Sequence, residues 1–207
     1  MVAVERRTAE ETRSCIMQVA WDLFRQLGPR TTIADVADKA GMSSANVYRF
    51  FPSKQALTEA VCESLLSETL RAARAAIDSA GSPSQRIAAM MMTLHQLMRD
   101  QMTTESRAYE IVEVAVTENW PPIIDYLGRC AAMLAEAIAD GQASGEFGPG
   151  DPLELGWMTM QACVVIHDPT LIPSYTVIRP RARPEEAIHF ALRALANPNP
   201  PPPLAGS

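Results

Sequence analysis

A short run of small, polar and aromatic side chains carries the clearest chemistry in this sequence. Residues 44–49 offer a hydroxyl, an amide, a phenol and a guanidinium, and the ammonium group of Lys54 follows soon after. Amides and guanidinium groups recognise base edges, whereas hydroxyls and cations bind phosphates. No apolar pattern assigns this face to a core. The run therefore predicts a surface that contacts nucleic acid.

Two short helices joined by a glycine turn are expected to position this face. A threonine at 31–32 with Asp35 in the first turn is typical of a helix start, and Gly41 of the left-handed residue after a helix end. A serine at 43–44 caps the next helix, which Pro52 ends because proline donates no backbone hydrogen bond. The apolar positions at helical spacing are Ile33, Val36, Ala37 and Ala40 in the first helix and Val47, Phe50 and Phe51 in the second. This pattern predicts a helix-turn-helix motif, although spacing alone also fits a structural corner that binds no DNA.

A longer motif extends this segment on both sides. It consists of Val36-Ala37, Ala40-Gly41-Met42-Ser43 and Val47-Tyr48-Arg49-Phe50-Phe51-Pro52-Ser53-Lys54-Gln55-Ala56-Leu57. With its flanks, from about Thr8 to Leu66, the motif resembles the N-terminal domain of the TetR family of bacterial transcriptional regulators. The family often has glycine where Ala45 stands and histidine or tyrosine where Phe50 stands. Because Phe50 donates no hydrogen bond, we expect the contact from that position to be missing here.

The resemblance implies a set of DNA-binding residues. It implies phosphate contacts from Thr32, Ser43, Tyr48 and Lys54, and base or mixed contacts from Ser44, Ala45, Asn46 and Arg49. It further implies a double-stranded DNA operator as the partner.

The charge is distributed unevenly along the chain. The net charge of the 207 residues is −6, which argues against a general nucleic-acid binder. Residues 1–55 contain eight basic and six acidic residues, whereas residues 56–207 contain ten and eighteen. This asymmetry fits a small DNA-facing domain joined to an acidic body.

Helical periodicity dominates the rest of the sequence and predicts an all-α protein of about nine helices. We expect a helix-turn-helix DNA-binding domain at 1–52, a helical regulatory and dimerisation domain at 53–196, and a disordered proline-rich tail at 197–207. Thr8 and Glu11 form a predicted capping box at the first helix. A continuous helix is expected from Asp151 to about His167.

A ligand site is predicted among the helices of the second domain. Methionines adapt to varied apolar shapes, and a few polar groups in an apolar site fix a ligand's orientation. The candidate ligand-binding residues are Met91, His95, Met98, Tyr109, Trp120, Tyr126 and Cys130. They suggest a small apolar or aromatic ligand. The same pattern also fits a plain core, in which His95 bonds to a core partner.

The last two predicted helices carry apolar stripes that suggest a homodimer. The candidate interface residues are Leu153, Trp157, Met160 and Val164 on one helix and Ile188, Leu192 and Leu195 on the other. Large aromatic residues often anchor interfaces, which favours Trp157. Burial within one subunit is the alternative.

Other classes of function find no support in the sequence. The three histidines and four cysteines show no metal-ligand spacing, so we expect no metal, no cofactor and reduced thiols. No catalytic motif is present, and an enzyme is not expected. The N-terminal segment lacks the apolar core of a signal peptide and no run is long enough to span a bilayer, which predicts a cytoplasmic protein.

These observations predict a homodimeric transcriptional regulator that responds to a small ligand, more a repressor than an activator. The main alternative is a helix-turn-helix regulator whose second domain docks a protein partner and binds no small ligand.

Overall fold

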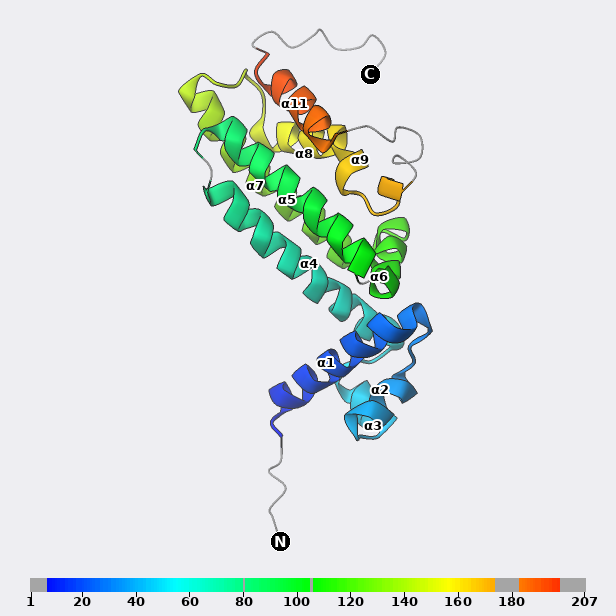
Figure 1. Ribbon diagram of the computed structural model, residues 1–207. Coiled ribbons are helices and arrows are strands. Elements are labelled where there is room, and N and C mark those ends of the chain that lie inside the picture. Colours follow the sequence, from blue (N-terminus) through cyan, green and yellow to red (C-terminus); the bar gives the residue numbers. More distant parts are fainter. Residues whose placement is uncertain (1–6, 80, 105, 174–182, 198–207) are drawn as a thin grey trace, which may run out of the picture. The chain divides into compact units, whose positions relative to one another are not determined.

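The computed structural model describes residues 7–79, 81–104, 106–173 and 183–197, and these ranges contain helices and no strand (Figure 1). The all-α prediction is confirmed, with ten α-helices and one 3₁₀ helix in the described ranges. The helices are α1 Ala9–Leu27, η1 Gly28–Arg30, α2 Ile33–Ala40, α3 Ser44–Phe50, α4 Lys54–Ser79, α5 Pro83–Thr104, α6 Ser106–Thr117, α7 Pro121–Ser144, α8 Pro152–Ala162, α9 Val164–His167 and α11 Pro184–Leu195.

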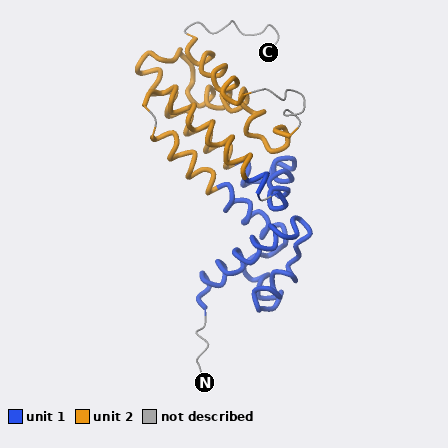
Figure 2. The backbone as a smooth tube through the Cα atoms, in the orientation of Figure 1, with its two compact units in different colours: residues 1–66, 101–124 blue, residues 67–100, 125–207 orange. Residues whose placement is uncertain are grey.

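The chain divides into two compact units (Figure 2). Unit 1 comprises residues 1–66 and 101–124, and unit 2 comprises residues 67–100 and 125–207. The predicted domain boundaries at 52 and 196 remain predictions. Residues 198–207, where most of the disordered tail is predicted, lie outside the described residues.

Local sequence signals set the ends of α1. The Thr8 amide donates to Glu11 Oε2 at 2.7 Å and the Glu11 amide donates to Thr8 Oγ1 at 3.1 Å, so the predicted capping box is confirmed. The helix ends at Gly28, whose φ of 60° favours glycine. Helix α1 contacts α2 and α6, and α2 contacts α3. The side chains of the first three helices that are larger than alanine and at most 1% exposed are Ile16, Phe24, Val36 and Val47.

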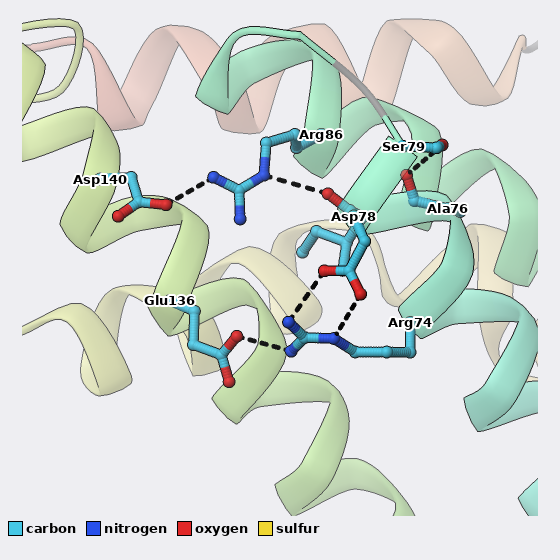
Figure 3. A network of polar contacts seen from close by, with 8 residues as sticks. Arg74, Ala76, Asp78, Ser79, Arg86, Glu136 and Asp140 are labelled. Carbon is cyan, nitrogen blue, oxygen red and sulfur yellow. Dashed lines mark hydrogen bonds and ion pairs between the residues drawn. The ribbon is translucent and has the colours of Figure 1, made fainter.

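Ion pairs connect α4, α5 and α7 within unit 2 (Figure 3). Arg74 of α4 contacts Glu136 of α7 at 2.5 Å, and Arg86 of α5 contacts Asp140 of α7 at 2.5 Å. The Nε of Arg86 also donates to the Ile77 carbonyl near the end of α4 at 3.0 Å. Because the carboxylates are largely exposed, these pairs contribute little free energy and mainly fix how the three helices are registered.

The predicted continuous helix from Asp151 to His167 is wrong, because the structure breaks it at Cys163. The Asp151 cap is present and accepts a hydrogen bond from the Glu154 amide at 2.9 Å. Beyond the break, His167 Nε2 lies 3.0 Å from the Met160 carbonyl oxygen, to which it donates. The buried histidine thus binds a carbonyl near the end of α8.

None of the helices in the described ranges is both long and apolar enough to cross a membrane.

Candidate nucleic-acid interface

The turn between α2 and α3 has the backbone geometry that the sequence predicts. Gly41 adopts a left-handed conformation with φ 67° and ψ 37°. The Met42 amide donates to the Ala37 carbonyl at 3.0 Å, which closes the end of α2. Ser43 caps α3, since its Oγ accepts from the Asn46 amide at 3.2 Å. The two helices are therefore joined by a short turn that is closed by hydrogen bonds at both of its ends.

The two adjacent threonines have different roles. Thr32 caps α2 and forms a capping box with Asp35: the Asp35 amide donates to Thr32 Oγ1 at 3.2 Å, and the Thr32 amide donates to Asp35 Oδ2 at 2.8 Å. Thr31 is buried, and its hydroxyl donates to the Gly28 carbonyl at 3.0 Å. Thr32 therefore is the capping residue, and Thr31 fixes the chain that enters α2.

Helix α3 has one buried face and one exposed polar face. Val47 is fully buried and Phe51, just after the helix, is 3% exposed, whereas Tyr48 is 49% exposed. Ala45 and Arg49 are exposed, and Ser44 and Asn46 are half-buried. The residues proposed to contact DNA thus lie outside the core of unit 1. Their side chains are available to a partner.

Asn46 and Arg49 are connected on this face. An Arg49 guanidinium N–H donates to Asn46 Oδ1 at 3.3 Å, and the side-chain nitrogen Nδ2 of Asn46 lies 3.5 Å from the Met42 sulfur. The Arg49–Asn46 contact uses one of five guanidinium donors, and no described residue is bonded to the others, so two of them can bind guanine. The pair is partly preorganised for contact with bases.

The start of α4 meets the chain that precedes α2. Lys54 Nζ donates to the Pro29 carbonyl at 2.7 Å, and the Thr32 hydroxyl donates to Asp35 Oδ2 at 2.7 Å. Hydrogen bonds from the Thr32 hydroxyl and amide, with a smaller effect from the Lys54 charge, lower the pKa of the Asp35 carboxyl. Asp35 is therefore ionised at neutral pH.

Sequence reasoning missed one contact that supports α3. The Arg13 guanidinium of α1 lies 5.0 Å from the centre of the Phe51 ring, which is within range of a cation–π interaction. No sequence signal links a residue of the first helix to the end of the third.

The candidate ligand-binding residues are divided between the two units. Tyr109 and Trp120 belong to unit 1, whereas Met91, His95, Met98, Tyr126 and Cys130 belong to unit 2. Six of the seven are buried, and Trp120 is half-buried. Their assembly into one ligand site remains a prediction.

The polar groups among these candidates have different surroundings. His95 Nδ1 lies 2.6 Å from the Ile166 carbonyl oxygen, and the Trp120 indole N–H donates to Glu118 at 2.8 Å. The Tyr109 hydroxyl is buried and has no hydrogen bond to any described residue, and burial raises its pKa. Burial also raises the pKa of Cys130 to about 12, so this thiol is protonated at neutral pH. Among His95, Trp120 and Tyr109, only Tyr109 has a buried donor that no described residue accepts.

No cluster of three or more histidine, cysteine or acidic side chains with the geometry of a metal site occurs among the described residues.

Helices α8 and α11 contact each other, and the candidate dimer residues on them differ in how far they are buried. Met160, Ile188 and Leu195 are buried within the chain, Trp157, Val164 and Leu192 are half-buried, and Leu153 is 46% exposed. Two more exposed apolar residues lie off the predicted stripes, namely Met158 at 60% and Phe190 at 63%. In the sequence, the apolar character of Met158 and Phe190 was the only indication of a role in an interface. The interface assignment remains a prediction.

An all-helical chain with a helix-turn-helix motif and an exposed polar α3 defines a class of DNA-binding transcriptional regulators. The comparison with known families supports this class. Residues 16–61 match the family described as bacterial regulatory proteins of the tetR family, and residues 83–186 match a tetracyclin repressor-like C-terminal domain. The chain belongs to the TetR family of bacterial transcriptional regulators.

Individual relatives agree with this assignment. The chain is 31% identical over 151 residues to the HTH-type transcriptional repressor KstR2 of Mycolicibacterium smegmatis. The aligned residues cover 69% of this chain and 71% of that protein. It is 38% identical over 66 residues to the HTH-type transcriptional regulator TtgR of Pseudomonas putida, which covers 31% of each. The fatty acid degradation regulator FadR from Bacillus halodurans shares the fold, with a TM-score of 0.62 at 12% identity over 93% of this chain and 97% of that one.

Proposed function

We propose that this TetR-family regulator is a repressor that binds a DNA operator as a homodimer and leaves it when a small apolar or aromatic ligand binds. The observation that carries the DNA-binding part is the exposed polar face of α3 opposite fully buried Val47. Repression is supported by the similarity to KstR2, which is itself named a repressor.

In this proposal α3 lies in the major groove and reads bases with Asn46 and Arg49. Asparagine pairs with adenine and arginine with guanine through two hydrogen bonds each, and these pairings give sequence preference. Ser44 and Ala45 approach the base edges at the start of the helix. The proposed phosphate contacts come from Thr32, Ser43, Tyr48 and Lys54. They supply affinity without sequence preference.

The proposed homodimer presents two copies of α3 to two half-sites of a roughly palindromic operator. Three apolar side chains on α8 and α11 are exposed, namely Leu153, Met158 and Phe190. Such a surface favours contact with another protein, and we assign this contact to the second copy of the chain. Trp157, Val164 and Leu192 border this set as half-buried residues. Met160, Ile188 and Leu195 support the surface from inside the chain.

The proposed ligand is neutral, with an apolar body. Met91, Met98 and Cys130 of unit 2 are buried and apolar or uncharged, which suits such a body. Separately, the buried Tyr109 hydroxyl of unit 1 donates to no described residue, and an oxygen that accepts from it would be bound favourably because a buried hydroxyl without a partner is costly. The alternative, a protein partner on the second domain, is favoured only by the exposed apolar side chains that we assign to the dimer.

Selection of bound duplexes from random DNA, followed by footprinting, tests the DNA-binding part. The wild type is expected to enrich a palindromic sequence. Asn46→Ala should weaken discrimination for that sequence by about ten- to a hundredfold and leave binding to random DNA nearly unchanged. An equal loss on both kinds of DNA would remove Asn46 from the base-reading residues. The matched control is Arg129→Ala, an exposed position in unit 2 whose loss should change neither.

Thermal shift against neutral aromatic and apolar metabolites tests the ligand part. A compound that raises the melting temperature and weakens operator binding supports release by a ligand. Operator release that requires a second protein and no small compound would support the alternative.

A further inference from the structure

One exposed arginine, Arg30, lies in the segment before α2, between two residues that hydrogen bonds hold in place. Pro29 is held by Lys54, whose Nζ donates to its carbonyl at 2.7 Å, and Thr31 is buried with its hydroxyl bonded to Gly28 at 3.0 Å. Arg30 stands between these two fixed residues and is exposed. Its Cα lies within about 7 Å of that of Thr32, because only two peptide bonds separate them. The backbone therefore presents Arg30 beside Thr32 and Lys54.

Donors at this corner are already engaged within the chain. The Thr32 hydroxyl donates a hydrogen bond to Asp35 Oδ2 at 2.7 Å, and Lys54 Nζ, which has three donors, donates one hydrogen bond to the Pro29 carbonyl. The Arg30 side chain, by contrast, makes no hydrogen bond or ion pair with any described residue. None of its five guanidinium donors is used by a residue that the structure describes, and a guanidinium can bind a phosphate with two of them.

The charge of the corner also depends on Arg30. Asp35 is ionised and lies near enough to Lys54 for the two charges to interact. These opposite charges cancel, which leaves the corner neutral without Arg30 and positive with it. Without Arg30, a phosphate approaching Thr32 and Lys54 would meet a corner of zero net charge, because Asp35 offsets Lys54.

We propose that Arg30 is a phosphate-binding residue of the DNA interface and supplies the net positive charge of the corner formed by residues 29–32, Asp35 and Lys54. The inference rests on the proposed DNA binding and adds a contact outside the helix-turn-helix motif. Its contribution is independent of base sequence, since it concerns the DNA backbone alone.

Salt dependence of binding to a short random-sequence duplex tests this inference. Affinity is measured by fluorescence anisotropy in a potassium chloride series for the wild type, R30A, R30Q and R30K. The loss of one phosphate contact should reduce the slope of log affinity against log salt by about 0.9 and weaken binding several-fold at low salt. R30A and R30Q should both show this loss, whereas R30K should keep most of the slope because it keeps the charge.

Two outcomes would overturn a proposal. A wild-type slope in both R30A and R30Q would overturn the inference and leave the DNA-binding proposal standing. Salt-independent or absent binding by the wild type would overturn the proposed function, and the inference with it. R129A provides the matched control for removing an exposed arginine elsewhere, and its slope should equal that of the wild type. Circular dichroism melting of each variant verifies that the fold is retained.

Discussion

The helix-turn-helix segment and the α8–α11 region are built by different kinds of interaction. Between residues 31 and 57, each helix end is set by a neighbour in sequence: Thr32 and Ser43 cap α2 and α3, and Gly41 closes α2. In the second region, the break at Cys163 is accompanied by bonds from outside the helix. His95 of α5 donates to the Ile166 carbonyl, and His167 donates back to Met160.

This difference matters for function. A recognition surface must keep the same shape whether or not a partner is present, and short-range caps fix it locally. A region held by longer-range contacts can instead change when those contacts change. Substitutions that act through local geometry should therefore be distinguishable from substitutions that act through burial or assembly.

The largest expected effect contrasts a buried and an exposed position. Val47→Asp would place an unpaired carboxylate at a fully buried site of α3, at a cost on the order of 4 kcal/mol. Phe190→Asp changes a side chain that is 63% exposed, so each chain should keep its helical content. The proposed dimer, however, should dissociate. Circular dichroism measures the first effect, and sedimentation equilibrium the second.

Two results would contradict this contrast. An unchanged melting temperature for Val47→Asp would show that the core of the helix-turn-helix is not what holds α3. A Phe190→Asp protein that still sediments as a dimer would place the interface away from α11.

The second expected effect contrasts two glycines. A Cβ on Gly156 would lie 2.6 Å from the Ala131 carbonyl oxygen, so Gly156→Ala should force α7 and α8 apart and cost about 2 kcal/mol. Gly41 has open space around its Cβ position, but its φ is +67°. Gly41→Ala should therefore cost only about 1 kcal/mol, from backbone strain alone. Chemical denaturation measures both values.

Two variants, Gly128→Ala and Gly41→Asn, provide the matched controls. Gly128→Ala, in α7 with nothing within 4 Å of the new Cβ, should be neutral or stabilising because alanine favours helices. Gly41→Asn should cost less than Gly41→Ala, since asparagine tolerates the left-handed conformation. If Gly128→Ala and Gly156→Ala were equally harmless, close helix packing would not explain the glycine in α8.

Sequence patterns predicted the elements whose ends depend on nearby residues. The capping box at Thr8 and the turn at Gly41 are confirmed, and of the alternative caps left open by the sequence the structure has Thr32 and Ser43. Each involves residues no more than five apart. Their physical cause, a hydrogen bond to an otherwise unsatisfied backbone group, can therefore be seen in the sequence itself.

Features that depend on long-range contacts were not predictable. An apolar stripe looks the same whether it meets another helix of the chain, as Ile188 does, or faces outward, as Phe190 does. The break at Cys163 and the bond from Lys54 to Pro29 likewise involve partners that no spacing rule connects. The proposed phosphate-binding role of Arg30 likewise depends on bonds at Pro29 and Thr31 that no spacing rule predicts.

The smallest expected effect uses pH to separate the two regions. Burial lowers the pKa of His167 below its ordinary value, so the unfolded chain binds a proton more readily than the folded one. Stability contributed by the neutral histidine is therefore complete above about pH 6.5 and declines as pH falls below it. Asp35 behaves differently: its lowered pKa makes its contribution complete above about pH 4 and lost only below that.

Of His167 and Asp35, only His167 should therefore change its protonation between pH 7 and pH 5, where melting temperatures are compared. His167→Gln keeps a donor for the Met160 carbonyl but cannot take up a proton, so it should flatten the decline over this range. Asp35→Asn should leave the decline unchanged, because Asp35 remains ionised throughout it. A decline that persists in His167→Gln would locate the acid-sensitive group outside the α8–α9 break. The buried His167 at that break would then not be the source of the acid sensitivity.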